Sequence, residues 1–332
     1  MIIVVNPHTP PEVAEAIAAR CEGTPVTEAD GARVVVAPSS YKSAPAGFDD
    51  AIAAVLVFDD DLQMGSLRHR PRRRVAFGGV EIGGDGCVTV MAAGPCSVES
   101  PEQIETVAAR LAALGVKCLR AGAYKPRTSP YTFQGLGRDG LALLRRTADR
   151  HGMAVVSEAR DGDNVADVLE FADVVQVGAK AMYDHAVLRA CGRSRKTVLL
   201  KRGFGATLQE FVQAAEFILS GGNTNVVLCE RGIRTFETKT RFTLDLCGVA
   251  WIKEKVNLPI VVDPSHAMGY RYGVPDLTRA AFAMGVDGLL IEVHPTPDTA
   301  LSDAAQQLDL DAFDRLYADL AALQAPLRRF LR

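Results

Sequence analysis

The chain has 332 residues, a hydrophobic fraction of 48% and a charged fraction of 23%, which are ordinary values for a water-soluble globular protein. Its 37 lysines and arginines nearly balance 40 aspartates and glutamates, giving a net charge of −3. This balance gives no support for binding nucleic acid or an anionic membrane. At this length, one large domain plus a small one is expected.

The cysteines and the amino terminus indicate the cellular compartment in which the protein is expected. Seven cysteines are scattered singly, and none forms a C-x-x-C pair. This is not a disulfide framework, and it fits a reducing compartment. The amino terminus, MIIVVNPHTP, has no basic region and too short an apolar run for a signal peptide, and no apolar stretch is long enough to span a bilayer. A cytoplasmic location is therefore expected.

The first 70 residues predict a small α+β domain. In chain order its segments read as a strand, a helix, a strand, and a helix or helix–strand unit: 1–5, 10–21, 31–38 and 48–59. This order indicates a ferredoxin-like domain of β-α-β-β-α-β type, shorter than usual. Residues 71–86 are expected to form a linker and a hairpin. The basic run RPRRR at 70–74 could be a nucleic-acid patch, but no aromatic residue is interleaved with it, which favours a solvated linker.

From residue 87 to the carboxyl terminus at 332, short apolar strands alternate with amphipathic helices. The eight expected strands are 87–93, 116–122, 153–158, 173–178, 197–203, 225–232, 259–266 and 287–295. Most are rich in Val, Ile and Leu with little polar alternation, as expected of parallel strands covered on both faces. Eight such units over about 240 residues predict a (β/α)8 TIM barrel. An open doubly wound sheet is the alternative, but GPCSVES after the first strand is not the Gly-rich turn typical of that fold.

Cationic residues follow several of the predicted strands. Barrel enzymes place their sites at the carboxyl ends of the strands. Six cations fall there: Arg120, Lys125, Arg127, Lys180, Lys201 and Arg231. Arginine pairs bidentately with phosphate or carboxylate and lysine supplies a point charge, so this excess indicates a multiply anionic ligand. For any one residue a structural salt bridge is an equal alternative, but six at one rim favour the ligand.

A second set at the same rim consists of four metal-ligand side chains from separate loops: Cys96, His266, Glu292 and Asp303. Thiolate, imidazole and carboxylate together suit Mn, Fe, Co, Zn or Cu better than Mg or Ca. Spacing alone leaves an alternative open. A lone buried cysteine is usually a small hydrophobe, and a histidine after a strand often satisfies a loop carbonyl.

Six segments resemble, in order and spacing, the 3-deoxy-D-arabino-heptulosonate 7-phosphate (DAHP) synthases of the type I beta subgroup: AGPCSVES, LRAGAYKPRTSPYTFQGLG, LLKRG, LCERGIRTFE, VVDPSHA and IEVHPTPDTALSD. The resemblance covers residues from about 85 to 310. It implies condensation of phosphoenolpyruvate with erythrose 4-phosphate and release of phosphate, at the entry to the shikimate pathway of aromatic amino acid biosynthesis. The subgroup often carries a small ferredoxin-like domain before the barrel, as expected here.

The same resemblance implies roles for individual residues. One divalent metal ion (Mn, Fe, Co or Zn) would be held by Cys96, His266, Glu292 and Asp303. Phosphoenolpyruvate would be held by Arg120, Lys125, Lys201 and Arg231. Lys180 stands where the family usually has arginine, and a point charge in place of a planar fork should weaken phosphate binding without abolishing it.

The KPRT segment is implied to reach the second substrate through Lys125, Pro126, Arg127 and Thr128. Pro126 excludes Lys125 from helical dihedrals and fixes its own φ, so the cations on either side are aimed before the sugar phosphate arrives. The related octulosonate 8-phosphate synthases resemble K-A-N-R here, so KPRT favours the four-carbon sugar.

Two residues are candidates to position water or to move protons, namely Lys125 and Glu158, the latter at the end of the third barrel strand. For Glu158 a structural salt bridge with a neighbouring cation is an equal alternative. A non-catalytic sugar-phosphate sensor is the remaining alternative for the whole barrel. An intact metal-ligand set argues against it, because a sensor has little use for a Lewis acid.

Every chemically suggestive residue lies beyond Arg74, and the first 70 residues hold no clustered cations and no ligand set. We therefore expect the small domain to be regulatory, docking across a neighbouring subunit's barrel rim and binding an aromatic amino acid as effector. The alternative is that it only supports oligomer assembly. A homo-oligomer is expected, with a tetramer favoured, and neither nucleic acid nor a membrane is expected as a partner.

Overall fold

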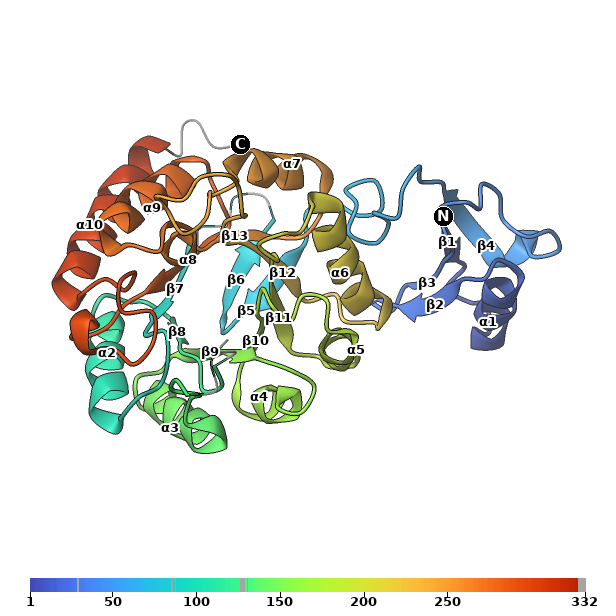
Figure 1. The fold of residues 1–332 in the computed structure, drawn as a ribbon. Helices are drawn as coiled ribbons and strands as arrows, with labels where there is room; N and C mark the ends of the chain where they lie inside the picture. Colours follow the sequence, from blue (N-terminus) through green and yellow to red (C-terminus); the bar gives the residue numbers. More distant parts are fainter. Residues whose placement is uncertain (29, 85, 87, 126–128, 130, 328–332) are drawn as a thin grey trace.

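A computed structural model gives the fold of the chain and describes all residues except 29, 85, 87, 126–128, 130 and 328–332. Eight parallel strands close into a barrel with helices around it (Figure 1). The strands are β7 (Val90–Gly94), β8 (Cys118–Arg120), β9 (Ala154–Ala159), β10 (Val174–Val177), β11 (Thr197–Lys201), β12 (Val226–Glu230), β13 (Ile260–Val262) and β14 (Gly288–Glu292). The predicted TIM barrel is confirmed, and the open doubly wound sheet is wrong because β14 pairs with β7 to close the ring.

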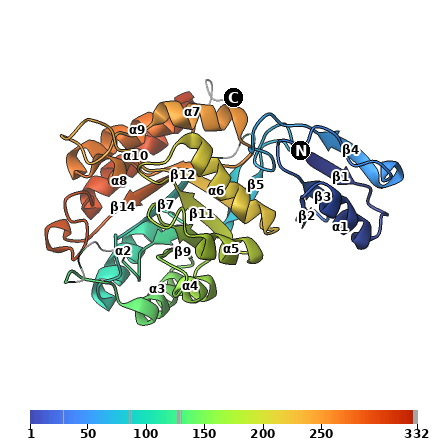
Figure 2. The ribbon, with the colours of Figure 1, turned by 45° about the vertical axis from the view of Figure 1, so that its right-hand side comes forward.

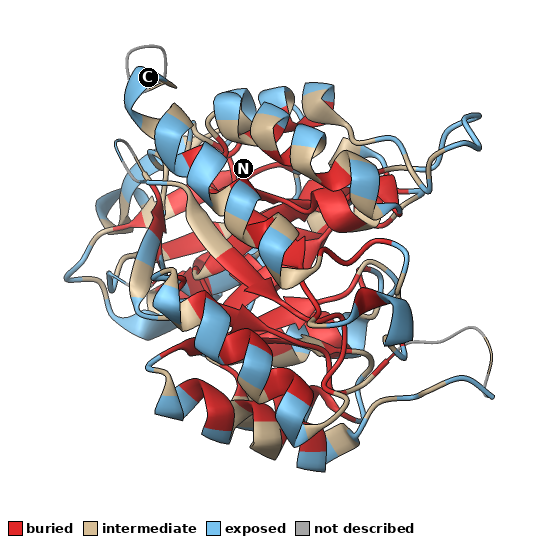
Figure 3. Ribbon diagram, turned by 90° about the vertical axis from the view of Figure 1, so that its left-hand side faces the viewer, coloured by how far each residue is buried: buried red, intermediate tan, exposed pale blue. Residues whose placement is uncertain are grey.

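The helices that surround the barrel are α2 (Pro101–Ala113), α3 (Gly137–Arg150), α4 (Val165–Phe171), α5 (His185–Arg193), α6 (Leu208–Ser220), α7 (Leu246–Lys255), α8 (Pro264–Met268), α9 (Val274–Ala283) and α10 (Leu310–Leu327). Their inner faces are buried against the strands and their outer faces are exposed (Figure 3). Local signals fix where they start. The hydroxyl of Ser100 caps α2, and Thr207 with Glu210 forms a capping box on α6. In the described part of the chain, no helix is long and apolar enough to cross a membrane.

The parallel register gathers the strand ends at one rim. Glu292 at the end of β14 lies opposite Gly94 at the end of β7, and Lys201 at the end of β11 lies opposite Cys229 of β12. Because parallel strands finish together, charged residues that are far apart in the sequence are neighbours at this carboxyl-end rim.

The opposite, amino end of the barrel is closed by an antiparallel hairpin of β5 (Arg74–Phe77) and β6 (Val80–Gly83). Val75, Phe77 and Ile82 of the hairpin are buried against the inward-facing apolar residues of the barrel. Gly78 in the turn has φ +59°, and a Cβ at this position would lie 2.2 Å from the Cβ of Ala154. Only glycine fits so close to the barrel wall.

The small domain contains β1 (Ile2–Val5), α1 (Pro11–Arg20), β2 (Thr24–Thr27), β3 (Arg33–Val36), the 3-10 turn η1 (Asp49–Ala51) and β4 (Ile52–Leu56). Its antiparallel sheet has the order β2-β3-β1-β4, which is a ferredoxin-like arrangement, as predicted. Of the two expectations for 48–59, the single helix is wrong, and the helix–strand unit is confirmed in part, with a 3-10 turn in place of the α-helix. The alanine-rich segment forms only η1 and then pairs with β1, so sheet pairing overrides its local helix propensity.

The segment between the domains is packed, so the prediction of a solvated basic linker is wrong. The guanidinium groups of Arg70 and Arg73 lie 2.5 and 3.1 Å from the carboxylate of Glu28, which follows β2. Arg72 lies 2.9 Å from Asp287, just before β14. The basic run is therefore neutralised by carboxylates from both domains.

A second set of contacts attaches this segment to helix α6. The carboxylate of Glu216 accepts hydrogen bonds from the backbone N–H groups of Gln63, Met64 and Gly65, at 2.9, 3.1 and 2.8 Å. The side chain of Asn257, just before β13, donates to the carbonyl oxygen of Met64. The small domain consequently lies beside the barrel next to α6, attached at the amino ends of the strands rather than at the carboxyl-end rim (Figures 1 and 2).

Candidate active site

A cavity of about 210 Å³ lies at the carboxyl-end rim of the barrel. Five cationic side chains and two carboxylates line it, with a histidine and two phenylalanines: Lys125, Lys180, Lys201, Arg231, Arg241, Glu158, Asp303, His266, Phe204 and Phe242. The sequence prediction named all of these charged residues and the histidine except Arg241. An excess of positive charge in a concave site favours an anionic ligand.

Arg231, directly after β12, is the strongest sign of such a ligand. Its side chain is buried, and its Nε and Nη1 atoms have no hydrogen-bond partner among the described residues. Its guanidinium carbon lies 4.3 Å from the ring centroid of Phe242. Burial lowers the pKa of Arg231. Buried donors without partners are costly, so this arrangement is suited to receive the oxygens of an anion.

The residues next to Arg231 form a structural ion pair. Arg202 Nη1 lies 2.9 Å from Glu230 Oε2 and 2.8 Å from Asp245 Oδ2. The other carboxylate oxygen of Glu230 accepts the N–H of Gly232 at 2.6 Å. Arg202, which is not one of the six predicted cations, is therefore a structural ion-pair residue, and its pair with Glu230 fixes the turn that presents Arg231 to the cavity.

Asp263 orients two cavity residues with one fully buried carboxylate. Its Oδ2 lies 2.5 Å from Lys201 Nζ and 2.7 Å from His266 Nδ1, and its Oδ1 accepts the backbone N–H of His266 as the N-cap of α8. Burial opposes the charge of Asp263, but His266 and Lys201 outweigh it and hold the pKa of this carboxyl well below its usual range.

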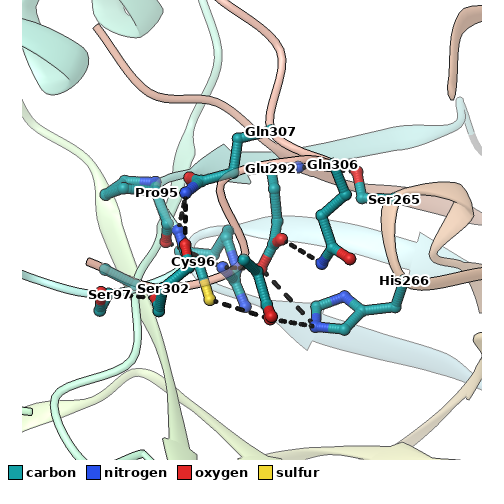
Figure 4. Close-up of polar contacts among 12 residues, drawn as sticks. Pro95, Cys96, Ser97, Ser265, His266, Glu292, Ser302, Gln306 and Gln307 are labelled. Atoms are coloured by element: carbon teal, nitrogen blue, oxygen red, sulfur yellow. Dashed lines mark hydrogen bonds and ion pairs between the residues drawn. The ribbon is translucent and has the colours of Figure 1, made fainter. Parts of the chain in front are cut away.

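The four predicted metal ligands come together beside the cavity, and Figure 4 labels three of them, Cys96, His266 and Glu292. Ligand atoms of Cys96, Glu292 and Asp303 all lie within 4.8 Å of one another. His266 Nε2 lies 3.7 Å from Glu292 Oε1 and 3.9 Å from Asp303 Oδ2. The loop after β7, the helix α8, the end of β14 and the loop beyond it each contribute one of the four.

This donor set fits a divalent transition metal. Burial raises the pKa of the Cys96 thiol to about 12, and the charge of Glu292 adds to that effect. Burial also lowers the pKa of His266, which favours the neutral imidazole that binds metals. A dication would offset the repulsion between the two carboxylates and stabilise the thiolate. One sulfur, one nitrogen and carboxylate oxygens are a mixed set that suits Mn, Fe, Co or Zn.

Two cations join the ligand set to the cavity. Lys125 Nζ lies 3.0 Å from Cys96 Sγ and donates to the Cys96 carbonyl oxygen at the same distance. Arg120, at the end of β8, donates from Nη1 to Glu292 Oε1 at 2.9 Å and to the carbonyl oxygen of Pro95 at 2.8 Å. An anion bound by these cations would therefore lie beside the ligand set.

The remaining predicted residues are placed as follows. Glu158 lines the cavity and accepts a hydrogen bond of 2.6 Å from Gln176 Nε2. Lys180 lines the same cavity. Pro126, Arg127 and Thr128 lie outside the described residues. The N–H of Lys125 donates to the carbonyl oxygen of Gln134 at 3.0 Å, which closes the base of the loop that carries them.

Sequence reasoning missed three polar residues of the site. Arg241 lines the cavity, lies 3.7 Å from Asp303 Oδ1 and donates to Gln306 Oε1 at 2.6 Å. Gln307 accepts the backbone N–H of Cys96. Arg241 lies in the loop between β12 and α7, outside the segments that carry the family resemblance. The two amides carry no charge, and their only signal is their place shortly after Asp303 in the same loop.

Comparison with the sequences of known proteins agrees with the family resemblance of the motifs. The chain matches the DAHP synthetase I family over residues 64–326. A phospho-2-dehydro-3-deoxyheptonate aldolase of Thermotoga maritima is 51% identical over 249 residues, which cover 75% of this chain and 73% of the relative. A 2-dehydro-3-deoxyphosphooctonate aldolase of Syntrophotalea carbinolica is 32% identical over 264 residues, which cover 74% of this chain and 94% of the relative.

Solved structures extend the likeness to the small domain. The crystal structure of phospho-2-dehydro-3-deoxyheptonate aldolase (DAHP synthase) from Thermotoga maritima has a TM-score of 0.80 and 40% identity, covering 98% of this chain and 97% of that chain. A truncated form of 3-deoxy-D-arabino-heptulosonate 7-phosphate synthase from the same organism has a TM-score of 0.74 and 45% identity, covering 80% of this chain and 97% of that one.

Proposed function

This chain belongs to the DAHP synthetase I family, and on that premise we propose that it condenses phosphoenolpyruvate with erythrose 4-phosphate to give DAHP and inorganic phosphate. This transferase reaction is the first step of the shikimate pathway. The observation that carries the proposal is the pairing, at one rim, of a cation-lined cavity with a cluster of Cys96, Glu292 and Asp303 beside His266.

Phosphoenolpyruvate carries a phosphate and a carboxylate, and the cavity offers a cation for each group. Arg231 would donate to phosphate oxygens through Nε and Nη1, the two donors that lack protein partners among the described residues. Lys201 and Lys180 would add point charges, and Arg120 and Lys125 would direct the enolpyruvate toward the ligand set. Lys125, Pro126, Arg127 and Thr128 would hold the sugar phosphate.

The chemistry requires an electrophilic aldehyde, a bound water and proton transfer. Cys96, His266, Glu292 and Asp303 would hold one divalent ion, which when bound supplies a Lewis acid for the aldehyde oxygen of the sugar. Carbon 3 of the enolpyruvate attacks the aldehyde carbon, water adds at carbon 2, and phosphate leaves with its bridging oxygen.

Two side chains are suited to the proton steps. Lys125 Nζ, 3.0 Å from Cys96 Sγ, would donate a proton toward the sugar oxygen as the new bond forms. Glu158 faces the same cavity and would orient the water and accept its proton. Both roles depend on the walls of the cavity excluding bulk water.

The division of labour between the domains follows from where they attach. Residues 1–70 would form a regulatory domain, 71–86 a linker and hairpin, and 87–332 the catalytic barrel of a cytoplasmic enzyme. The small domain is attached at the amino end of its own barrel, away from the carboxyl-end rim. An aromatic amino acid effector would therefore act by docking this domain on a neighbouring subunit's rim, in a homo-oligomer that we take to be a tetramer.

The test is an assay of phosphate release from phosphoenolpyruvate with either erythrose 4-phosphate or arabinose 5-phosphate. Rapid release with the four-carbon sugar is expected. A preference for arabinose 5-phosphate would overturn the proposal in favour of an octulosonate 8-phosphate synthase. Release with neither sugar, in a protein that binds both substrates, would identify a sensor.

A further inference from the structure

Two consecutive amides, Gln306 and Gln307, lie beside the metal-ligand set in the loop after β14 (Figure 4). Both side chains are buried, with exposed fractions of 2% and 0%. A buried amide is costly unless both its carbonyl and its NH₂ group find partners. The partners of these two are therefore informative.

Gln307 joins the loop of one metal ligand to the loop of another. Its Oε1 accepts the backbone N–H of Cys96 at 2.9 Å, and its Nε2 donates to the carbonyl oxygen of Ser302 at 2.9 Å. The hydroxyls of Ser302 and Ser97 lie 2.8 Å apart and form a second link between the same loops. The position of Cys96 is thus tied to the residue that precedes Asp303.

Gln306 makes the corresponding link to the third ligand. Its Nε2 donates to Glu292 Oε2 at 2.5 Å, and its Oε1 accepts from Arg241 Nη1 at 2.6 Å. This leaves Glu292 Oε1 directed at Arg120 and His266. The amide therefore determines which carboxylate oxygen faces the ligand set.

The backbone between these links is strained. Asp303 has φ +49°, in the left-handed region that residues with a Cβ rarely adopt. Such a conformation is unfavourable and persists only when the surrounding structure holds it. Gln307 holds the residue before Asp303, and the N–H of Gln306 donates to the Asp303 carbonyl oxygen at 3.2 Å.

We propose that Gln306 and Gln307 are positioning residues that set the geometry of the metal site, Gln307 through Cys96 and Asp303 and Gln306 through Glu292. The inference rests on the proposed metal-dependent function. Each amide must accept at one end and donate at the other, a pairing that neither an apolar side chain nor a carboxylate reproduces. Loss of an outer hydrogen-bond partner of this kind typically weakens metal binding by about 10–100-fold.

The experiment compares Gln306→Met and Gln307→Met with the wild-type chain. Methionine keeps the approximate length of glutamine and removes both hydrogen bonds. The matched control is Gln63→Met, because Gln63 is also buried with bonded amide ends but lies between the small domain and the barrel. The affinity for Co²⁺ is measured by competition with a chromophoric chelator, and the thiolate-to-Co²⁺ absorption band reports the Cys96 bond.

Both site variants are expected to bind Co²⁺ about 10–100-fold more weakly, while Gln63→Met binds it as the wild type does. The thiolate band should change most in Gln307→Met, because that amide holds Cys96. If a methionine variant fails to fold, Gln307→Glu keeps the acceptor for Cys96 but loses the donor to Ser302, and it should show a smaller weakening.

Unchanged affinity and spectrum in the folded site variants would overturn the inference and leave the metal site standing. Equal weakening in Gln63→Met would also overturn it, because the effect would then be general destabilisation. A wild-type chain that binds no Co²⁺ would instead refute the proposed metal site, and this inference with it.

Discussion

The two ends of the barrel bury opposite kinds of side chain, although the same eight strands form both. At the carboxyl end, charged side chains such as Arg120, Asp263 and Glu292 are almost completely buried. At the amino end, Phe77 and Ile82 of the hairpin fill the barrel with apolar side chains. Burying charge costs free energy even when the charges are paired, whereas burying apolar surface supplies it. The apolar packing at the amino end therefore contributes folding free energy that offsets the cost of burying charged groups at the carboxyl end.

This contrast implies that substitutions at the two ends should separate activity from stability. Removing a charged group from the carboxyl end should abolish a function while changing the free energy of unfolding little. Removing an apolar group from the amino end should do the reverse.

The largest effect is expected from loss of the metal. A chelator should abolish activity, and Mn, Fe, Co or Zn ions should restore it. His266→Ala should lower kcat/KM by about 1000-fold or more, because a bound metal stabilises transition-state charge by several kcal/mol. His266 lies at the rim, in contact with Asp263 and near Glu292 and Asp303, so the barrel should remain folded. Activity is measured together with bound metal and circular dichroism.

Full turnover in a preparation shown to be free of metal would refute this prediction. The matched control is His151→Ala, because His151 lies directly after α3 and its Nε2 lies 2.7 Å from Glu105 Oε1, away from the cavity. This variant should keep both metal and activity.

At the amino end, Phe77→Ala should lower the free energy of unfolding by about 3–5 kcal/mol, as expected for a buried phenylalanine whose removal leaves a cavity. The kcat/KM of the protein that remains folded should be unchanged, because Phe77 lies at the end of the barrel remote from the cavity. Urea unfolding and initial rates give the two quantities.

Phe236→Ala provides the matched control, since this phenylalanine is 97% exposed. Its free energy of unfolding should stay within about 0.5 kcal/mol of the wild type. A Phe77→Ala variant that is as stable as the wild type but inactive would show that the hairpin serves the site rather than the fold.

The same contrast explains how much could be predicted from the sequence. Parallel strands buried on both faces read as continuous apolar runs, so all eight barrel strands were found. The charged residues at their ends stood out against those runs. The second helix of the small domain is only a 3-10 turn, because the alanine-rich segment before Phe58 suits a helix locally but pairs with β1 as a strand, as the helix–strand alternative allowed.

Within the site, formal charge at the strand ends and the segments that carry the resemblance were the signals, and residues outside both were missed. Gln306 and Gln307 act through hydrogen bonds that only the folded loops create. Arg241 reaches the cavity from a loop whose path the sequence does not give. The packing of the basic linker was hidden for a similar reason, because Glu28 comes from the other domain.

A smaller effect is expected from removing the small domain. A chain beginning at residue 62 keeps the backbone groups that bind Glu216 and should retain the barrel and its basal activity. If the domain is regulatory, tyrosine or phenylalanine should inhibit the full chain and not the shortened one. Couplings between sites of this kind usually amount to about 5–150-fold. Inhibition is measured as the concentration of amino acid that halves the rate.

If the full chain ignores every aromatic amino acid, or the shortened chain stays equally inhibited, the regulatory prediction fails. Altered assembly without any change in inhibition would assign the domain to oligomer formation. Sedimentation of both chains distinguishes that outcome.

The smallest effect is expected from Lys180→Arg, which probes how finely the charged end is tuned. Lys180 lines the cavity, and an arginine there can make two parallel hydrogen bonds to a phosphate where lysine offers a point charge. The KM for phosphoenolpyruvate should therefore be unchanged or lower. The added hydrogen bond would strengthen binding of the phosphate by up to about 1 kcal/mol. Lys196→Arg is the matched control, because Lys196 donates to the Ala172 carbonyl oxygen outside the cavity, and it should leave KM unchanged. A large loss of activity in Lys180→Arg alone would show that the surrounding loops are shaped to lysine, so that the charged end is packed as closely as the apolar one.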